Sequence, residues 1–225
     1  MIPLHDLERT RRPAIATRLV LLGIALVWIY TLTLVDRPAE LAAFYERWSF
    51  DWEELISGLR SGRPDLAALA TLVTHQFLHG GWLHVLGNAL YLWIFGDNVE
   101  DRLGSGRFLV LYLASGAVAA IGQALVAPGA LVGASGAIAA VLGAYLVLSP
   151  GARVRTLVFL GIFITVVTLP AVLVIGLWLV VQILSGASLM RLEAHEATAR
   201  VAYAAHVTGF VSGIVMVRVL GARRR

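Results

Sequence analysis

The sequence predicts an all-α, polytopic membrane protein. Hydrophobic residues make up 59% of its 225 residues and charged residues only 14%. The mean hydropathy of +0.81 is higher than that of a soluble domain. The apolar runs are continuous and about twenty residues long, as membrane helices require, whereas the strands of a membrane barrel are about ten residues long and alternate in polarity.

Six membrane spans are expected from the apolar runs. They cover Ala14–Val35, Trp82–Phe95, Phe108–Val126, Ser135–Leu148, Val154–Leu184 and Val201–Leu220. The fifth run is longer than the roughly 20 residues that cross a bilayer, and Pro170 interrupts it. One tilted span with an interfacial lead-in therefore competes with two short re-entrant segments, and we favour the single span.

The distribution of charge predicts that both termini are cytoplasmic. With six spans, the side that holds the termini carries twelve of the eighteen basic residues, all of them arginines, and the other side carries six. This bias supports a cytoplasmic tail over residues 1–13, a membrane domain over 14–220 and a basic cytoplasmic tail over 221–225. Because the arginines flank membrane spans, we interpret them as orientation signals and expect no nucleic-acid partner.

The long connection over residues 36–72 is expected to lie outside. Its apolar residues recur at intervals of three and four, and charged residues occupy the opposite face, as in a helix lying in the membrane interface. The apolar face consists of Leu41, Phe44, Tyr45, Trp48, Trp52, Leu55, Ile56 and Leu59. We predict an amphipathic interfacial helix over residues 39–60, with an ordinary soluble loop helix as the alternative.

Polar residues inside the apolar spans are the candidate functional residues, because polar and ionisable side chains are costly in a membrane. They are His84 and Asn88 in the second span, Ser135 at the start of the fourth and His206 near the start of the sixth. These three spans all run from outside to inside. The four side chains are therefore expected to converge at a depth that external water can reach.

These residue types suit acyl transfer. Ser135 supplies a hydroxyl nucleophile and His206 a base, which burial is expected to keep neutral. No carboxylate lies in the outer half of any span, so we predict a Ser-His dyad. The backbone of Ser135 and the side chains of His84 and Asn88, which share a helix face, are candidate oxyanion donors. The chain has no cysteine, which excludes a thiolate nucleophile.

Small residues explain how nucleophile and base can approach each other. Gly209 and Gly213 form a G-x-x-x-G pattern just after His206, and Gly136 and Gly143 lie on the fourth span. Small-residue faces let two helix backbones pack closely. The sequence therefore predicts close contact between the fourth and sixth helices.

Taken together, the motifs resemble those of the rhomboid family of intramembrane serine proteases, in its bacterial form. The resemblance is carried by His75-x3-His79-x4-His84-x3-Asn88, Gly133-Ala134-Ser135-Gly136, Ala205-His206-x2-Gly209-x3-Gly213 and the connection from Gly96 to Gly104. It implies a six-helix bundle with an interfacial first-loop helix, a Ser135–His206 dyad, and an oxyanion hole formed by His84, Asn88 and Ser135.

The resemblance also implies a function and a location. The expected reaction is hydrolysis of peptide bonds in or next to transmembrane segments of membrane protein substrates, without metal or cofactor. The expected site is the bacterial inner membrane, with the active site open to the external side and the lipid bilayer as its surroundings. The motifs predict no oligomeric state.

Two departures from the family pattern concern supporting residues. Ala70 and Thr71 stand where many members carry Trp-Arg, and Ala139 stands where an aromatic residue often stacks on the catalytic imidazole. The first loop and the orientation of His206 therefore lack their usual supporting residues.

The first two motif histidines are open to a second interpretation. His75 and His79 share a helix face and could join His84 in a metal site, but Gly80 and Gly81 break the helix and no carboxylate partner follows. We expect no metal and interpret His75 and His79 as structural hydrogen-bonding residues. Close-packing support is expected from Gly133, Gly136, Gly209 and Gly213.

Two other functions compete with proteolysis. A transporter would place polar residues near the membrane midplane in repeated segments, and no such repeat is evident. An inactive rhomboid-like protein that binds transmembrane helices is the stronger rival. Such proteins typically lose the serine or the histidine, and this chain has both Ser135 and His206.

Overall fold

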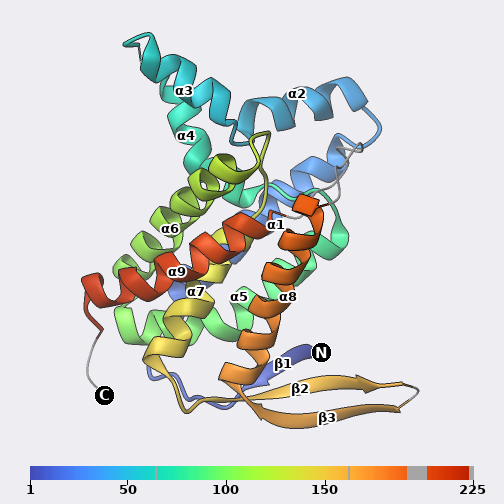
Figure 1. The fold of residues 1–225 in the computed structure, drawn as a ribbon, viewed down its shortest axis with the longest axis vertical. Coiled ribbons are helices and arrows are strands. Elements are labelled where there is room, and N and C mark those ends of the chain that lie inside the picture. The colour runs from blue at the N-terminus through green and yellow to red at the C-terminus, as the bar shows by residue number, and fades with distance from the viewer. Residues whose placement is uncertain (64, 162, 192–201, 223–225) are drawn as a thin grey trace.

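Helices make up most of the molecule, with a small sheet at one end and the helical first loop at the other (Figure 1). The computed structural model describes residues 1–63, 65–161, 163–191 and 202–222. Two parts of the predicted organisation, the start of the last span at Val201 and the arginines at 223–225, lie outside these ranges.

Within the described residues, six long helices form the bundle. They are α1 (Ile15–Thr33), α5 (Trp82–Leu103), α6 (Ser105–Val126), α7 (Ser135–Leu148), α8 (Ala171–Arg191) and α9 (Tyr203–Leu220). Each overlaps one of the predicted spans, so the apolar runs identified helices correctly. Helix α7 is central, because most of its residues are buried among α5, α6 and α9.

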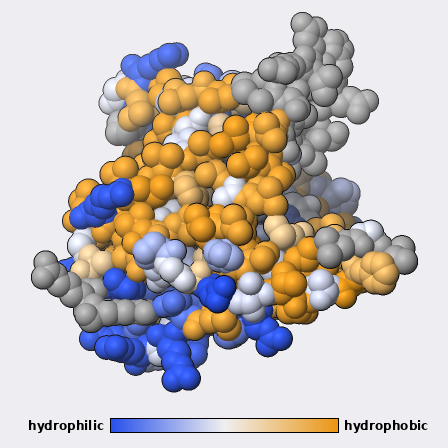
Figure 2. All heavy atoms as spheres, turned by 60° about the horizontal axis from the view of Figure 1, so that its bottom comes forward, coloured by the Kyte–Doolittle hydropathy of each residue, from blue (hydrophilic) through white to orange (hydrophobic). Residues whose placement is uncertain are grey.

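The outer face of the bundle is apolar. Helix α1 exposes a row of large aliphatic side chains, Ile15, Leu19, Leu22, Leu26 and Ile29. Figure 2 shows apolar side chains over much of the flank and hydrophilic ones gathered toward the lower edge. By length and composition, α1, α6 and α9 could each cross a membrane, while α7 and the segments Ala171–Leu184 and Leu66–Phe77 are shorter apolar helices. These helices fit an integral membrane protein, and the count of six spans stays a prediction.

The predicted helix over residues 39–60 is two helices, α2 (Pro38–Trp48) and α3 (Trp52–Arg60), followed by α4 (Leu66–Thr74) and the short 3₁₀ helix η1 (His75–Phe77). The break has two causes. The backbone of Phe50 exchanges hydrogen bonds of 3.0 and 2.8 Å with Leu131. The Asp51 carboxylate then accepts from the N–H groups of Glu53 and Glu54 and so starts a new helix. The segment is mostly helical, the single continuous helix was wrong, and its location in the membrane interface stays a prediction.

The all-α prediction missed a three-stranded antiparallel sheet with the order β1-β2-β3. Its strands are β1 (Ile2–Asp6), β2 (Arg153–Leu160) and β3 (Phe163–Pro170). Part of the segment predicted as an N-terminal tail is therefore an edge strand, and the first half of the predicted fifth span is a β-hairpin. Helix α8 begins at Ala171, directly after Pro170.

The hairpin has a physical explanation in the same residues that suggested a span. Every second residue from Val154 to Val158 is β-branched, as is every residue from Ile164 to Thr168, which favours strands. Gly161, between the strands, has a φ of 63°, a left-handed conformation that glycine adopts readily. Mean hydropathy cannot distinguish a buried strand from a helix, and the expected lead-in was therefore assigned the wrong structure.

Candidate active site

Ser135 is the first residue of α7 and is half-buried. The loop before it is anchored by the N–H of Gly133, which donates to the carbonyl oxygen of His75 at 2.8 Å. Helix α7 begins without a side-chain cap among the described residues. Its first N–H groups, which have no partner inside a helix, can therefore accept a negative charge from outside.

Two features of position 133 disfavour any residue larger than glycine. Its φ of 122° lies in the region that favours glycine. A methyl group built on it would also lie only 2.6 Å from Nε2 of His84. The imidazole of His84, from the first turn of α5, therefore lies directly against the loop that delivers Ser135.

His206 lies in the first turn of α9 and is only 6% exposed. Its Nδ1 is 2.8 Å from Oε1 of Gln182 on α8. The ring centroid of Trp178, also on α8, is 5.5 Å from that of the imidazole. Helix α8 thus contacts His206 both at Nδ1 and at the ring.

Helices α7 and α9 pack closely at the turns that carry Ser135 and His206. A methyl group at Gly209 would overlap the carbonyl oxygen of Gly136, and one at Gly213 would overlap that of Ala140. A methyl group on Gly136 would lie 3.7 Å from the side chain of Ala205. Gly136 follows Ser135 and Ala205 precedes His206, so the predicted pair sits where the two helix starts meet.

Asn88 lies one turn after His84 on α5 and is 8% exposed. Its Nδ2 is 2.9 Å from Nε2 of His79, to which it donates. One amide hydrogen of Asn88 is therefore used for orientation. The other stays available, as an oxyanion donor requires.

His75 and His79 each make separate hydrogen bonds. Nδ1 of His75 donates to the carbonyl oxygen of Thr71 at 2.7 Å, and Nδ1 of His79 donates to that of Phe77 at 3.3 Å. The backbone carbonyl of His79 accepts from the Tyr45 hydroxyl at 2.7 Å. Among the described residues, no group of three His, Asp or Glu side chains could hold a metal ion. These contacts tie the first loop to the site.

Gln182 and Trp178 were not among the predicted site residues. Both lie in the apolar run of the predicted fifth span. One amide side chain hardly changes the mean hydropathy of such a run. The usable signal was that Gln182 is a polar side chain surrounded by Val180, Val181, Ile183 and Leu184, which is costly in a membrane. The structure directs it toward His206.

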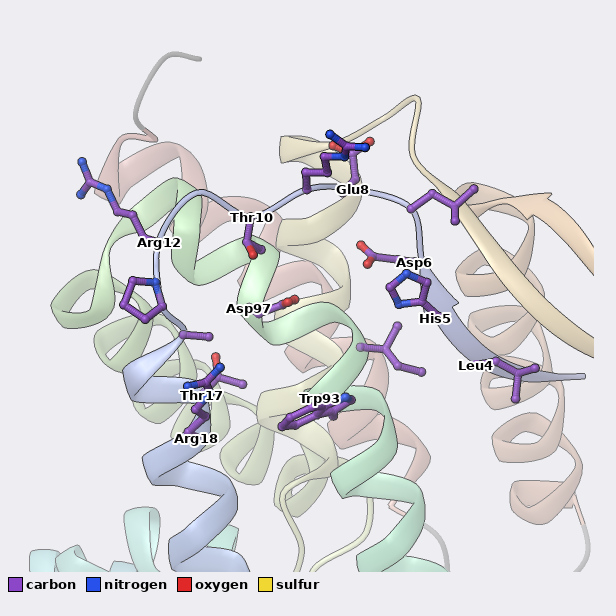
Figure 3. A pocket seen from close by; sticks show the side chains of 15 residues that line it. Leu4, His5, Asp6, Glu8, Thr10, Arg12, Thr17, Arg18, Trp93 and Asp97 are labelled. Atoms are coloured by element: carbon purple, nitrogen blue, oxygen red, sulfur yellow. The ribbon is translucent and has the colours of Figure 1, made fainter.

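A pocket of about 730 Å³ lies elsewhere, under the N-terminal segment at the sheet end. Figure 3 shows His5 and Asp6 from β1 near Asp97 of α5, with Trp93 below. Asp97 is thirteen residues from His84, which corresponds to about 20 Å along α5. This pocket is therefore separate from the residues around Ser135.

Comparison with known proteins gives a consistent family. The model of the rhomboid domain matches residues 67–223. Over 96 residues the chain is 42% identical to the rhomboid protease GluP of Bacillus subtilis (strain 168), covering 43% of this chain and 19% of that protein. It is 35% identical over 97 residues to the putative rhomboid protease YdcA of the same organism, covering 42% of this chain and 48% of that protein.

A third relative is the rhomboid protease GlpG of Yersinia pestis (strain Pestoides F). The identity is 38% over 71 residues, which cover 32% of this chain and 26% of that protein. The matched stretches thus span less than half of each of these three relatives.

Proposed function

Because this chain belongs to the rhomboid family, we propose that it is an intramembrane serine endopeptidase with Ser135 as nucleophile and His206 as general base. One observation carries the proposal. It is the close contact between the starts of α7 and α9, where Gly209 packs on Gly136 and Gly136 on Ala205. The substrates are membrane proteins, cut in or next to their transmembrane segments.

The reaction runs through an acyl-enzyme. Nε2 of His206 takes the proton from the Ser135 hydroxyl as its oxygen attacks the peptide carbonyl. The tetrahedral intermediate collapses, and the imidazolium gives that proton to the leaving amine. Water then attacks the ester with His206 again as base, which releases the carboxylic acid and restores the serine. The cycle needs no metal and no cofactor.

The developing oxyanion is held by three kinds of donor. These are the first N–H groups of α7 at Ser135, the imidazole of His84 and the second amide hydrogen of Asn88. Such preorganised donors are worth about 3 to 4 kcal/mol each when removed singly from other serine proteases. The hydrogen bond from Asn88 to His79 supports this role, because it fixes the direction of the amide.

We further propose six spans in a bacterial inner membrane, with both termini cytoplasmic and the site open to the external side. The arrangement is consistent with this topology, since β1 and the carboxyl end of α9 lie in the lower half of Figure 1 while the loop before α7 lies in the upper half. The first loop, α2 to α4, would then cover the external side of the site.

Labelling with a fluorophosphonate, followed by mass-spectrometric mapping, tests the proposal. We expect modification at Ser135 and none in a folded His206→Ala variant. A folded wild-type protein that is not labelled and does not cut a transmembrane substrate would contradict the proposal. That result would favour a rhomboid-like protein that binds transmembrane helices.

A further inference from the structure

We infer that Gln182 is a positioning residue for the base, and that helix α8 thereby sets the orientation of the catalytic imidazole. This inference rests on the proposed function, since it takes His206 as the base. The observation behind it is the 2.8 Å contact between Oε1 of Gln182 and Nδ1 of His206. The motifs of the sequence had pointed to a dyad with no third member.

The chemistry of the two groups fixes the tautomer. An amide oxygen only accepts hydrogen bonds, so Nδ1 of His206 must carry the hydrogen. A neutral imidazole has one N–H and one lone pair, and the lone pair is therefore on Nε2. Nε2 is then the ring nitrogen able to take the proton of Ser135. The tautomer with its hydrogen on Nε2 could not act as this base.

The same contact serves both protonation states. When His206 is protonated during the reaction, Nδ1 remains a donor and the amide oxygen of Gln182 remains its acceptor. The imidazolium gains a charge-assisted hydrogen bond without any rearrangement of the side chains. The neutral amide oxygen of Gln182 can thus accept the hydrogen bond from Nδ1 that a carboxylate would otherwise accept.

A second side chain of α8 acts on the ring itself. Trp178 lies four residues before Gln182, on the same helix face, and its ring is inclined at 42° to the imidazole. Trp178 also lies 6.3 Å from the ring of Tyr91 on α5. Ala139, where an aromatic was expected beside the imidazole, is fully buried in α7. The ring of His206 thus has two aromatic neighbours, Trp178 from α8 at 5.5 Å and Tyr203 from its own helix at 6.4 Å.

The placement on α8 has a consequence for the site. Gln182 and Trp178 contact His206 from a helix other than the two that carry the dyad. Any displacement of α8 away from α9 removes both contacts together. The orientation of the base thus depends on the position of α8, whereas the distance between the α7 and α9 backbones is set by the glycines.

The test compares Gln182→Leu, which has no acceptor, with Gln182→Glu, which keeps one. The readouts are the rate of fluorophosphonate labelling at Ser135 and the ¹⁵N NMR shifts of His206, assigned by their loss in His206→Ala. We expect Gln182→Leu to slow labelling about tenfold, the loss of one buried hydrogen bond, and to mix the two tautomers. Gln182→Glu should label within about threefold of wild type, because its carboxylate still accepts from Nδ1.

Ile183→Leu is the matched control, since Ile183 is exposed on α8 and should label at the wild-type rate. Apparent unfolding temperatures show which variants are folded, and Gln182→Met, of equal length, replaces the leucine variant if that one is not. The inference would be overturned if the folded Gln182→Leu or Gln182→Met variant were labelled at the wild-type rate and kept the wild-type tautomer of His206. Absence of labelling in the wild type would instead refute the proposed function.

Discussion

Two clusters of buried polar groups lie toward opposite ends of the bundle, and they differ in how their hydrogen bonds are used. At the sheet end, the Glu100 carboxylate accepts from the N–H groups of Ala16 and Thr17 at 2.9 and 2.8 Å and from the Ser105 hydroxyl at 2.6 Å. In this way a side chain of α5 caps the start of α1.

Asp6 is bound in a similar way. Its Oδ2 accepts from the Asn98 amide at 2.6 Å and from the Tyr145 hydroxyl at 2.8 Å. These bonds attach β1 to α5 and α7. The hydrogen bonds of Glu100 and Asp6 named here each join two elements of the fold, so we assign this cluster a structural role.

In the cluster around Ser135, only some of the polar atoms make hydrogen bonds within the described part of the protein. The described bonds of His79 with Asn88 and of Gln182 with His206 orient the side chains. Among the described residues, no hydrogen bond uses Nε2 of His206 or the second amide hydrogen of Asn88, both of which the proposed reaction requires. The difference teaches that hydrogen bonds between elements, such as those of Glu100 and Asp6, stabilise the fold, whereas oriented side chains with a free donor or acceptor can take part in chemistry.

The largest effect should come from removing the nucleophile. Ser135→Ala is expected to lower proteolysis at least about 10³-fold, because no other group can form the acyl-enzyme. Its unfolding temperature should stay within about 2 °C of wild type. A cleavage assay on a transmembrane substrate in detergent or vesicles measures the first effect.

Ser212→Ala is the matched control for the nucleophile. Ser212 donates to Ser115 at 2.9 Å between α9 and α6, so its loss should cost about 1 kcal/mol of stability and little activity. Equal loss of activity in both serine variants would contradict the role of Ser135 as nucleophile.

Gly209→Ala should affect stability and activity together. The added methyl overlaps the carbonyl oxygen of Gly136, so α7 and α9 must separate, at a cost of about 3 kcal/mol. Labelling at Ser135 should fall at least about tenfold in the protein that remains folded. Chemical unfolding and labelling of the same sample measure both quantities.

Gly87→Ala supplies the comparison for that variant, since a methyl at Gly87 meets no atom within 4 Å. It should be neutral or slightly stabilising, because alanine favours a helix. A Gly209→Ala protein that kept both wild-type stability and wild-type labelling would show that the helix approach is not needed.

Glu100→Ala should lower stability without lowering the rate of labelling at Ser135. It leaves buried N–H groups at the start of α1 without their acceptor, which should cost about 2 to 3 kcal/mol of unfolding free energy. The folded fraction should label at the wild-type rate. Glu53→Ala, at an exposed position on α3, should lie within about 0.5 kcal/mol of wild type.

The smallest effect is a pH dependence at Asp6. Burial raises the pKa of Asp6 to about 6, the hydrogen bond from Tyr145 opposes the shift, and repulsion by Asp97 adds to it. The folded state therefore holds this proton more tightly than the unfolded chain, whose pKa is near 3.8. The penalty of the charged form is present above pH 6 and is relieved as the pH falls from about 6 toward 4.

Asp6→Asn keeps an oxygen that can accept from Asn98 and Tyr145 but carries no charge. We expect it to raise the apparent unfolding temperature by about 2 °C or more at pH 7.5 and by less at pH 4.5. A gap between variant and wild type that widened at the lower pH would contradict the sign of this shift.

The sequence predicted the helices that carry the candidate site better than the ends of the molecule. The predicted span Ser135–Leu148 is the helix α7 itself, because a uniformly apolar run flanked by glycine leaves few alternatives. The hairpin over 153–170 was missed because β-branched residues are apolar enough to pass for a span. The break at residues 49–51 was missed because the pairing of Phe50 with Leu131 joins positions far apart in the chain.

Gln182 shows a second limit. Motif spacing identifies residues that match a family pattern, and it selected Ser135, His206, His84 and Asn88 as candidates. Motif spacing cannot show which side chain of an apolar helix without a motif faces these residues, because that depends on how α8 packs on α9. The contact between Gln182 and His206 is therefore seen only in the structure.

The most direct test of the account is an experimental structure of the protein with a phosphonate bound to Ser135. We predict that Nε2 of His206 lies within hydrogen-bonding distance of Ser135 Oγ, and that the phosphonyl oxygen accepts hydrogen bonds from the start of α7 and from Asn88 or His84. An imidazole turned away from Oγ, or an oxygen pointing away from all these donors, would contradict it.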